Sequence, residues 1–387
     1  MNKTIKEKTL LYQTNSIYFA QCRHGIEDIV ADELREIGAL DISTGFSGVH
    51  FKASDSVLYS IIYSAKTVSR VLAPIAEFNI KNTEELYYRT NSIEWENIFN
   101  LNNSFSVSSS VSNSCISNSH FALLKVKDAV ADRFIERTVK RPDVNREDPD
   151  IRINLNLRND KVRISLDASG EPMHKRGYRI EKVTAPLNET LAAAIIRISG
   201  WDGKTALYDP MTGSGTILAE GLLKLKKIPS GFKKDNFGIF SFPDFDKMLW
   251  EKIKNKFDDS ILEFSENIIA GSDINKDAIR AAKKNLAEIP QGEKIKLSTI
   301  DFREIPSLKE RTIITNLPYG ERLENKRDAE KLYKEFGDFL KNKCTGSKAF
   351  LLCGSTDLVK KIGLRTKRKI PFFNGPIEAR LIELDLY

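Results

Sequence analysis

The second half of the chain alternates short apolar runs with longer amphipathic segments, and this alternation constrains the fold more than any other feature. Apolar runs of strand length occupy residues 206–209, 268–273, 295–301, 312–316 and 349–353, and helical periodicity occupies residues 187–199, 216–225, 276–289 and 329–340. Strands that alternate with helices in this way form a parallel sheet covered by helices on both faces. A last alternating run follows at residues 381–386. The pattern therefore predicts an α/β fold with a doubly wound sheet for residues 187–387.

The first half has a different pattern, which is typical of small α+β units. Strand-like and helix-like segments follow one another at residues 17–20, 25–37, 49–53 and from Asp55 onward, which favours a small sheet with helices on one face. A second unit contains a strand at 105–111, a helix at 118–138 and a hairpin whose two arms, 151–157 and 162–166, meet at Asn159-Asp160. Residues 169–186 are basic and resemble a linker. We therefore predict domains at 16–68, 69–168 and 187–387, with a linker at 169–186.

Composition limits the cellular context. With 387 residues the chain is long for a single core, and its net charge of +7 fits either a nucleic-acid partner or a solvated basic surface. The four cysteines form no CxxC pair, so we expect free thiols and no metal site. The polar, lysine-rich start is unlike a signal peptide, and no apolar run reaches membrane-spanning length. These features predict a cytoplasmic protein without membrane association.

The sequence DPMTGSGT at residues 209–216 has the character of a cofactor loop. It follows a predicted strand and opens a predicted helix, where glycines allow close backbone approach and free N–H groups favour polar ligands. The dinucleotide fingerprint GxGxxG fails, because Leu218 stands where its third glycine would be. A purely structural strand-to-helix turn remains the alternative reading of this loop taken alone.

Three acids end three successive predicted strands: Asp209, Asp273 and Asp301. In an open α/β sheet, the acid at the tip of the second strand can bind both hydroxyls of a ribose. Asp301 offers an acceptor for an adenine amine, and the neighbouring Phe302 offers a ring beside the base. No basic cluster for phosphate accompanies them, so the set favours a nucleoside cofactor over NAD or ATP.

The sequence NLPY at residues 316–319 ends the fourth strand and can cradle an amine. The exocyclic amine of a base is a poor nucleophile, because its lone pair is delocalised into the ring. The side-chain oxygen of Asn316 and the carbonyl of Leu317 can accept its two N–H bonds and free the lone pair. Pro318 holds that carbonyl outward, and Tyr319 offers a flat face to the extruded base. A structural Pro-Tyr turn is the alternative.

These motifs resemble the class I S-adenosylmethionine-dependent methyltransferases that act on amines, and more closely the THUMP-domain RNA guanine-N2 methyltransferases of bacterial 23S rRNA. The resemblance extends through DASG at 167–170, HKRGY at 174–178, APLNETLA at 185–192, GWD at 200–202 and FNGPI at 373–377. It implies an N-terminal ferredoxin-like unit, a THUMP domain and a Rossmann-like catalytic domain with an antiparallel last strand. It also implies S-adenosylmethionine as the cofactor. The aromatic stretch 226–267 resembles an insertion of this family, and we expect its rings to lie in the core.

The resemblance implies a role for each residue that matches its motifs. The candidate catalytic residues are Asn316, Leu317, Pro318 and Tyr319. The candidate cofactor-binding residues are Leu187, Asp209, Pro210, Thr212, Gly213, Ser214, Gly215, Thr216, Asp273, Ile274, Asp301, Phe302 and Asn316. The sequence departs from the family pattern twice, because Leu317 replaces the usual first proline and Thr212 replaces a common cysteine.

Basic residues near the catalytic half supply candidate RNA contacts, with a solvated surface as the alternative. These candidates are Lys175, Arg176, Tyr178, Arg322, Arg365, Lys367, Arg368 and Lys369. We expect a monomer that methylates guanine N2 in large-subunit rRNA. Action on tRNA, or a non-catalytic role in RNA binding or ribosome assembly, remains open. The N-terminal half disfavours an adenine-N6 DNA methyltransferase, and the failed fingerprint disfavours an NAD oxidoreductase.

Overall fold

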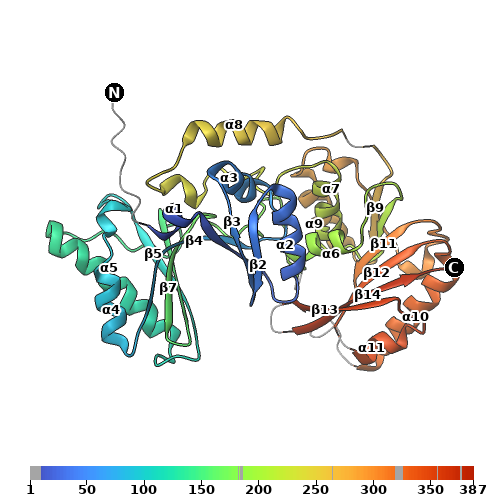
Figure 1. Cartoon of the computed structure of the whole chain (residues 1–387). Coiled ribbons are helices and arrows are strands. Elements are labelled where there is room, and N and C mark those ends of the chain that lie inside the picture. The colour runs from blue at the N-terminus through green and yellow to red at the C-terminus, as the bar shows by residue number, and fades with distance from the viewer. Residues whose placement is uncertain are drawn as a thin grey trace.

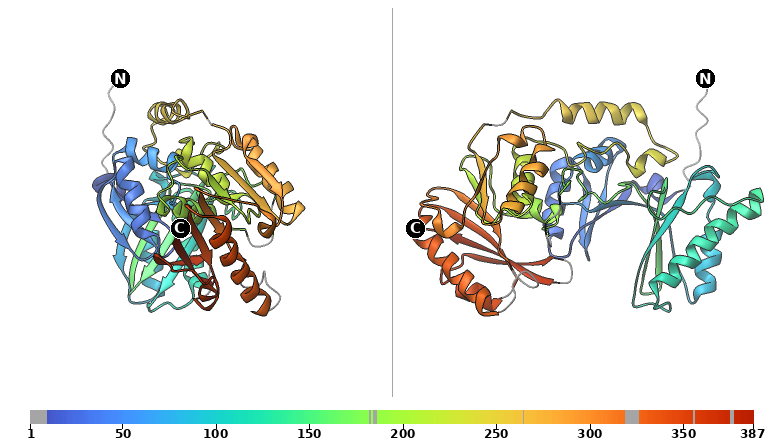
Figure 2. Two further views of the ribbon diagram at one scale, coloured as in Figure 1. Left: turned by 90° about the vertical axis from the view of Figure 1, so that its right-hand side faces the viewer. Right: turned by 180° about the vertical axis from the view of Figure 1, so that it is seen from behind.

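The computed structural model describes residues 10–181, 183, 186–263, 265–318, 326–354, 356–374 and 377–387. Two seven-stranded sheets dominate it, one in each half of the chain (Figure 1). The same arrangement is seen from behind in Figure 2, where the unit containing α4 and α5 lies farthest from the C-terminus. Among the described residues, no helix combines the length and the apolar character needed to cross a membrane.

The first sheet has the strand order β2-β3-β1-β4-β7-β6-β5. Its strands are β1 (Ile17–Gln21), β2 (Leu40–Gly45), β3 (Gly48–Lys52), β4 (Arg70–Asn79), β5 (Phe105–Ser112), β6 (Ile151–Arg158) and β7 (Lys161–Asp167). Its helices are α1 (Leu11–Asn15), α2 (Glu27–Ile37), α3 (Asp55–Ser64), α4 (Thr83–Asn91) and α5 (Ser119–Thr138), with the 3-10 turn η1 (Trp95–Asn97). The predicted hairpin is present, and inward residues of β6 alternate with outward ones as expected.

Strand β4, which the sequence pattern did not predict, joins the two N-terminal units into one sheet. Its first residues pair with β1, as Leu72 does with Phe19. From Leu72 to Asn79 it pairs with β7. The predicted division between residues 68 and 69 therefore falls just before a strand that both units use, and the exact domain limits stay a prediction.

The second sheet has the order β10-β9-β8-β11-β12-β14-β13, and β14 runs antiparallel to β12. Its strands are β8 (Leu207–Asp209), β9 (Ile269–Asp273), β10 (Lys296–Thr299), β11 (Thr312–Asn316), β12 (Lys348–Cys353), β13 (Arg368–Asn374) and β14 (Ile377–Asp385). The helices around it are α6 (Glu189–Ile198), α7 (Thr216–Leu225), α9 (Lys276–Ala287), α10 (Lys326–Lys343) and α11 (Thr356–Lys361), with the 3-10 turns η3 (Gly292–Lys294) and η4 (Phe302–Glu304). This arrangement confirms the predicted Rossmann-like fold with an antiparallel last strand.

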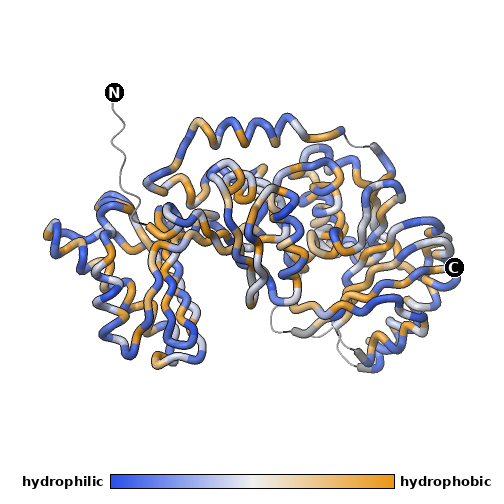
Figure 3. The backbone as a smooth tube through the Cα atoms, viewed as in Figure 1, coloured by the Kyte–Doolittle hydropathy of each residue, from blue (hydrophilic) through white to orange (hydrophobic). Residues whose placement is uncertain are grey.

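Burial explains why these strands read as continuous apolar runs. All five residues of β11 are buried, as are five of the six residues of β12. Central strands covered on both faces have no polar side, in contrast to the half-exposed β6. Figure 3 shows the same contrast, with hydrophobic colour concentrated along the strands of the second sheet.

Residues 226–267 cross from the catalytic half back over the N-terminal half, and contain η2 (Gly238–Ser241) and α8 (Lys247–Asp258). Helix α8 lies above α3 in Figure 1. The ring of Trp250 packs edge-on against Tyr59 and Tyr63 of α3, with centroids 5.7 and 5.9 Å away. The Tyr63 hydroxyl donates to Asp258 at 2.6 Å. The predicted role of these aromatic residues in the core is confirmed.

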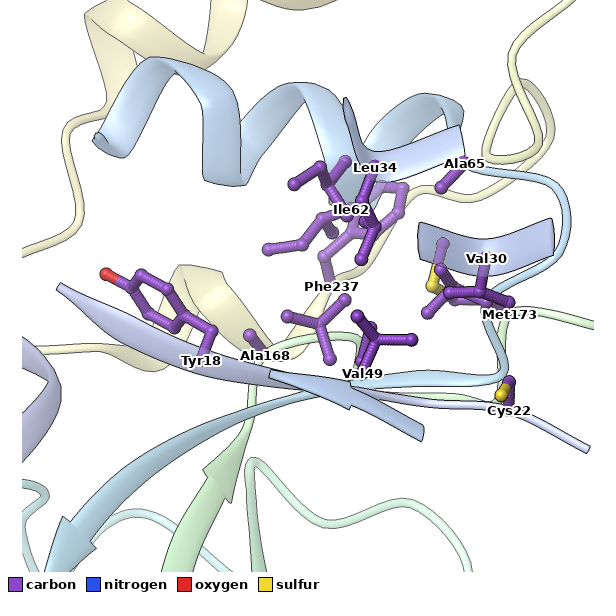
Figure 4. Close-up of a cluster of buried hydrophobic side chains, with 14 of the residues drawn as sticks. Tyr18, Cys22, Val30, Leu34, Val49, Ile62, Ala65, Ala168, Met173 and Phe237 are labelled. Atoms are coloured by element: carbon purple, nitrogen blue, oxygen red, sulfur yellow. The ribbon is translucent and has the colours of Figure 1, made fainter. Parts of the chain in front are cut away.

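One hydrophobic core continues from the N-terminal units through the predicted linker into this crossing segment. Figure 4 shows Ile62, Met173 and Phe237 converging in that core, each from a different one of these three parts. Met173 is 3% exposed. Tyr178 of the same stretch is also buried in this core, so part of the predicted linker packs between the halves, and the limits of the linker stay a prediction.

Candidate active site

A cavity of about 790 Å³ lies where β8, β9 and β11 end. The carboxyl ends of parallel strands share one edge of the sheet, which is the usual ligand site of such folds. Eight of the predicted site residues line this cavity: Pro210, Gly213, Asp273, Ile274, Asp301, Phe302, Asn316 and Pro318. The structure thus brings together part of the cofactor loop, two of the three strand-end acids, and Asn316 and Pro318 of the amine cradle.

The two glycines of the loop, Gly213 and Gly215, are needed for different structural reasons. Gly213 has φ of +53°, and a Cβ built there would meet nothing within 4 Å, so its backbone faces the open cavity. Its N–H donates to Asp273 at 2.9 Å, which ties the loop to β9. Gly215 has φ of +85°, and a Cβ there would approach the Cβ of Ala282 to 3.2 Å. Gly213 therefore gives access to a ligand, whereas Gly215 lets α7 pack against α9.

Asp209 lies behind the cavity wall, where it is 1% exposed. One carboxylate oxygen accepts hydrogen bonds from the Thr315 hydroxyl at 2.7 Å and from the Met211 N–H at 3.1 Å. Burial raises the pKa of Asp209 to about 7, although those two hydrogen bonds oppose the shift. Its predicted role in binding the cofactor stays a prediction.

Asp273 and Asp301 both line the cavity, but different groups hold their carboxylates in place. Asp273 also accepts from the Asn275 N–H at 2.9 Å, and these bonds to main-chain N–H groups fix its position. Asp301 accepts from the Arg303 guanidinium at 2.6 Å. The carbon of that guanidinium lies 4.7 Å from the centre of the Phe302 ring, so Arg303 lies over the ring that we expect to adjoin the adenine.

The charges that line the cavity suit a cationic nucleoside. Among the described residues, four carboxylates and two guanidinium groups line it, each guanidinium is paired with a carboxylate, and Glu181 is paired with Lys284. The described lining therefore carries a negative excess, which disfavours an ionised phosphate. S-adenosylmethionine carries a positively charged sulfur, so the residues present fit that cofactor. The carboxylates are Glu181, Asp273, Asp277 and Asp301, and the guanidinium groups belong to Arg280 and Arg303.

Asn316 is the most informative residue of the site. Its side chain is 9% exposed, and its Oδ1 atom is buried without a hydrogen-bond partner among the described residues. A buried amide oxygen without a partner costs about 1–3 kcal/mol, so such atoms call for an explanation. Other buried side-chain atoms without a partner among the described residues include Ser272 Oγ and Lys226 Nζ, but neither of these residues lines the cavity. Asn316 does, which places an unused acceptor at the cofactor cavity.

The departure at Leu317 has a structural account. The Leu317 side chain is fully buried in a second core cluster with residues such as Tyr333 and Phe336, and its N–H donates to Leu352 at 3.1 Å. A proline would lose that hydrogen bond, so the leucine fixes the backbone by other means. Tyr319 and Arg322 lie outside the described residues.

Leu187, Thr212, Ser214 and Thr216 are buried near the loop without lining the cavity. Arg179 holds two of them together, because its guanidinium donates to the Leu187 carbonyl at 2.7 Å and to the Thr216 hydroxyl at 2.8 Å. Sequence reasoning missed Arg179. A direct cofactor contact by these four residues stays a prediction, and what the structure gives them is a role in shaping the loop.

Two predicted RNA contacts are wrong, because the structure buries them. Arg176 and Tyr178 are each 1% exposed and reach Glu220 on α7, at 3.3 Å from Arg176 Nε and 3.0 Å from the Tyr178 hydroxyl. Arg176 also donates to the carbonyls of Met173 and Lys66, so it ties the N-terminal half to the catalytic half. Burial would lower the pKa of Arg176, but the Glu220 carboxylate outweighs it and the pKa is raised.

The other basic candidates that the structure describes lie on the surface. Lys175 is exposed and pairs with Glu171 at 2.9 Å. Lys367 and Arg368 both pair with Glu383 of β14. Arg365 and Lys369 are exposed. The sequence signal that could have revealed the burial of Arg176 and Tyr178 is Glu220, an acid within the mainly apolar and buried helix α7.

Known families match nearly the whole chain. Residues 176–383 match the family described as RMKL-like, methyltransferase domain. Residues 81–167 match the THUMP domain, and residues 18–72 match the RlmL ferredoxin-like domain. The order of the three matches is the order that the sequence resemblance implied.

Individual proteins agree with these matches. A candidate RNA methyltransferase of Synechocystis sp. is 35% identical over 97% of this chain and 98% of its own length. A ribosomal RNA large subunit methyltransferase K/L of Psychromonas ingrahamii is 36% identical over 94% of this chain, which spans 49% of that protein. The crystal structure of a candidate methyltransferase complexed with S-adenosylhomocysteine has a TM-score of 0.86 and 27% identity, covering 96% of this chain and 98% of its own.

Proposed function

This chain belongs to the RMKL-like methyltransferase family, with ferredoxin-like and THUMP domains before the catalytic domain, and from that membership we propose that it methylates the exocyclic N2 of a guanine in 23S rRNA. It is an S-adenosylmethionine-dependent methyltransferase. Beyond that activity, we propose which atom receives the methyl group, guanine N2, and which RNA contains that guanine, 23S rRNA.

The unpartnered Oδ1 of Asn316 carries the proposal. S-adenosylmethionine, when bound, supplies a methyl group activated by its cationic sulfur. Asn316 Oδ1 accepts one N–H of the guanine amine, and the Leu317 carbonyl accepts the other. Both bonds favour the tetrahedral nitrogen of the transition state over the planar amine, so they lower the barrier rather than tighten binding of the RNA. The methylated nitrogen then releases its proton to the cradle or to water, and no histidine is required.

The choice of RNA rests on the N-terminal half. A base must leave its stack to reach the cavity, which favours a single-stranded or looped target held by other parts of the protein. The THUMP match and the rRNA methyltransferase relative support a large-subunit rRNA substrate. A tRNA guanine, or a non-catalytic role in ribosome assembly, is the competing assignment.

Mass mapping of modified nucleosides tests the assignment. Large-subunit rRNA and bulk tRNA are compared between cells that contain the protein and cells that lack it, and between cells complemented with wild type or with Asn316→Ala. We expect one N2-methylguanosine of 23S rRNA to disappear without the protein and to return only with wild type. A loss confined to tRNA would replace the proposal with the tRNA assignment. An unchanged nucleoside content in both RNAs would refute it.

A further inference from the structure

Resting on the proposed function for its RNA ligand, we propose that Phe46 and His24 form a stacking platform that holds an unpaired base of the substrate RNA beside the catalytic edge. The platform is separate from the methyl-transfer cavity, since neither residue lines that cavity. It would bind a nucleotide that is not the one modified, and so orient the strand.

The platform is a stack of flat groups from four separate parts of the chain. The His24 ring lies between Phe46 and Phe373, with centroids 5.0 Å from each and interplanar angles of 30° and 35°. On the other side, the Arg158 guanidinium lies 5.7 Å from the centre of the Phe46 ring. Phe46 belongs to the β2–β3 turn, His24 to the β1–α2 loop, Phe373 to the end of β13 and Arg158 to the end of β6. A single exposed phenylalanine would be unremarkable, whereas a stack assembled from four segments is a built feature.

Phe46 is exposed but rigidly held. Its side chain is 67% exposed. The Glu27 carboxylate accepts hydrogen bonds from the Ser47 N–H at 3.0 Å and the Gly25 N–H at 2.7 Å, and it contacts His24 Nδ1 at 2.9 Å. The Ser47 carbonyl accepts from the Cys22 N–H at 2.9 Å. The turn that carries Phe46 and the loop that carries His24 are thus fixed by one carboxylate, and a base that stacks there orders little of the protein.

Gly25 brings the N-terminal half against the catalytic half at this point. Its φ is +90°, and a Cβ built there would lie 3.3 Å from the Pro371 carbonyl oxygen and 3.6 Å from the Phe373 ring. The absence of a side chain at Gly25 lets His24 meet Phe373. The platform therefore spans the junction between the two halves.

Strand register places the platform on the same edge as Asn316. Asn316 pairs with Leu352, Leu352 with Leu381, and Leu381 with Ile370, so Ile370 is level with Asn316 across the sheet. Phe373 lies three residues farther toward the carboxyl edge of the sheet, because β13 runs in the same direction as β12. Strand spacings put it roughly 14 Å across the sheet and about 10 Å beyond Asn316. A strand of RNA with its base in the cavity can reach that distance with a neighbouring nucleotide.

The chemistry of the stack favours RNA over a protein partner. Aromatic rings beside a cation are the common means of holding single-stranded nucleic acid without reading its sequence. Arg158 is exposed, and its long side chain can move off the Phe46 ring. A base can then stack on that ring while the guanidinium pairs with the adjoining phosphate. The net charge of +7 favours an anionic ligand as well.

Binding of fluorescein-labelled oligo(A), single-stranded or annealed to oligo(U), tests the platform. Phe46→Ala is expected to weaken single-strand binding by about 5- to 150-fold, because base–aromatic stacking contributes ~1–3 kcal/mol. Phe46→Tyr should restore it, and duplex binding should change little. Leu40→Ala is the matched control, because Leu40 is 68% exposed and begins β2, whereas Phe46 directly follows the other end of that strand. Equal single-strand affinity of Phe46→Ala and wild type would overturn the proposal.

A tryptophan at the platform gives a direct readout. The three native tryptophans are at most 3% exposed, so the added ring of Phe46→Trp is the solvent-exposed reporter. We expect oligo(A) to quench its fluorescence with the affinity measured by the label. No quenching by bound oligo(A) would overturn the platform and leave the proposed function standing if 23S rRNA is still methylated. Quenching by a protein that methylates no RNA would support the platform and refute the proposed function.

Discussion

Two buried polar regions of this molecule differ in whether their atoms are partnered. At the junction of the halves, Arg176, Tyr178 and Glu220 are almost fully buried and bond to one another. At the catalytic edge, the buried Oδ1 of Asn316 has no partner among the described residues. A buried polar group that is hydrogen-bonded within the protein avoids the cost of an unmet bond, whereas an unsatisfied acceptor at a cavity is free to meet a ligand.

Sequence composition alone does not show whether a basic residue is buried in the fold or exposed to a ligand. The sequence placed Arg176 and Tyr178 in a basic, RNA-facing segment, and the structure turns both inward to Glu220 on α7. The basic residues near β13 have the same composition, yet Arg365 and Lys369 stay exposed. The burial that the fold imposes, rather than the density of charge in the sequence, decides which cations are structural.

The largest expected effect is on stability at the junction. Glu220→Ala leaves the Arg176 charge buried and uncompensated, so we expect a loss of about 3–5 kcal/mol in the free energy of unfolding, measured by urea denaturation. Tyr178→Phe removes one hydrogen bond and should cost about 1 kcal/mol. Asn316→Ala should keep the wild-type midpoint, because its side-chain oxygen has no partner among the residues that the structure describes. If Asn316→Ala were as destabilised as Glu220→Ala, the contrast between the two regions would be lost.

The next effect concerns the cofactor. Asp273→Ala is expected to weaken S-adenosylmethionine binding by roughly 2 kcal/mol or more, through loss of charge-assisted hydrogen bonds to the ribose. Isothermal titration calorimetry measures it. Asp273→Asn keeps an acceptor for the Gly213 N–H and separates loss of charge from loosening of the loop. An unchanged affinity in Asp273→Ala would remove this residue from the ribose role.

A smaller effect follows from Asp209. Burial raises the pKa of its carboxyl to about 7, so the group is protonated and neutral below that pH and becomes an anion above it. If the anion holds the amino group of the cofactor, affinity should rise with pH, by about fivefold between about pH 6 and 7. Asp209→Asn should flatten this dependence. A wild-type affinity that is constant over the same range would contradict the assignment.

The smallest effect is expected at the exposed cations. Arg365→Glu and Lys369→Glu should each reduce the slope of log affinity against log salt for single-stranded RNA by about 0.7, the value for one lost phosphate contact. Folding should be unaffected. Lys204→Glu is the control, since Lys204 is exposed and pairs only with a neighbouring acid, Asp202. Slopes equal to wild type would assign Arg365 and Lys369 to the solvated surface.

Local patterns predicted the elements whose signal is contained within a few residues. The hairpin of β6 and β7 was predicted because one of its faces is solvated and its turn is explicit. The strand-end acids were predicted because each directly follows a buried run. The α7 boundaries were also predicted, since Gly215 opens that helix in the left-handed region.

Elements that depend on distant partners were not predictable. Strand β4 is apolar without alternation because strands from both N-terminal units flank it, and its Pro74 lies at a shift of register against β7. Strand β13 begins within a basic cluster and contains Pro371, which an edge strand tolerates. The contacts of Arg176 join residues 44 and 110 positions apart, so no local pattern reports them.

Single-turnover methylation by Asn316→Ala, at saturating cofactor and RNA, tests the central claim most directly. Because the cradle acts as the amine changes geometry, the rate of the chemical step should fall by on the order of 10²–10³, the cost of losing one preorganised polar partner. Affinities for cofactor and RNA should stay within a few-fold of wild type. A wild-type single-turnover rate would contradict the assignment of Asn316 to the target amine.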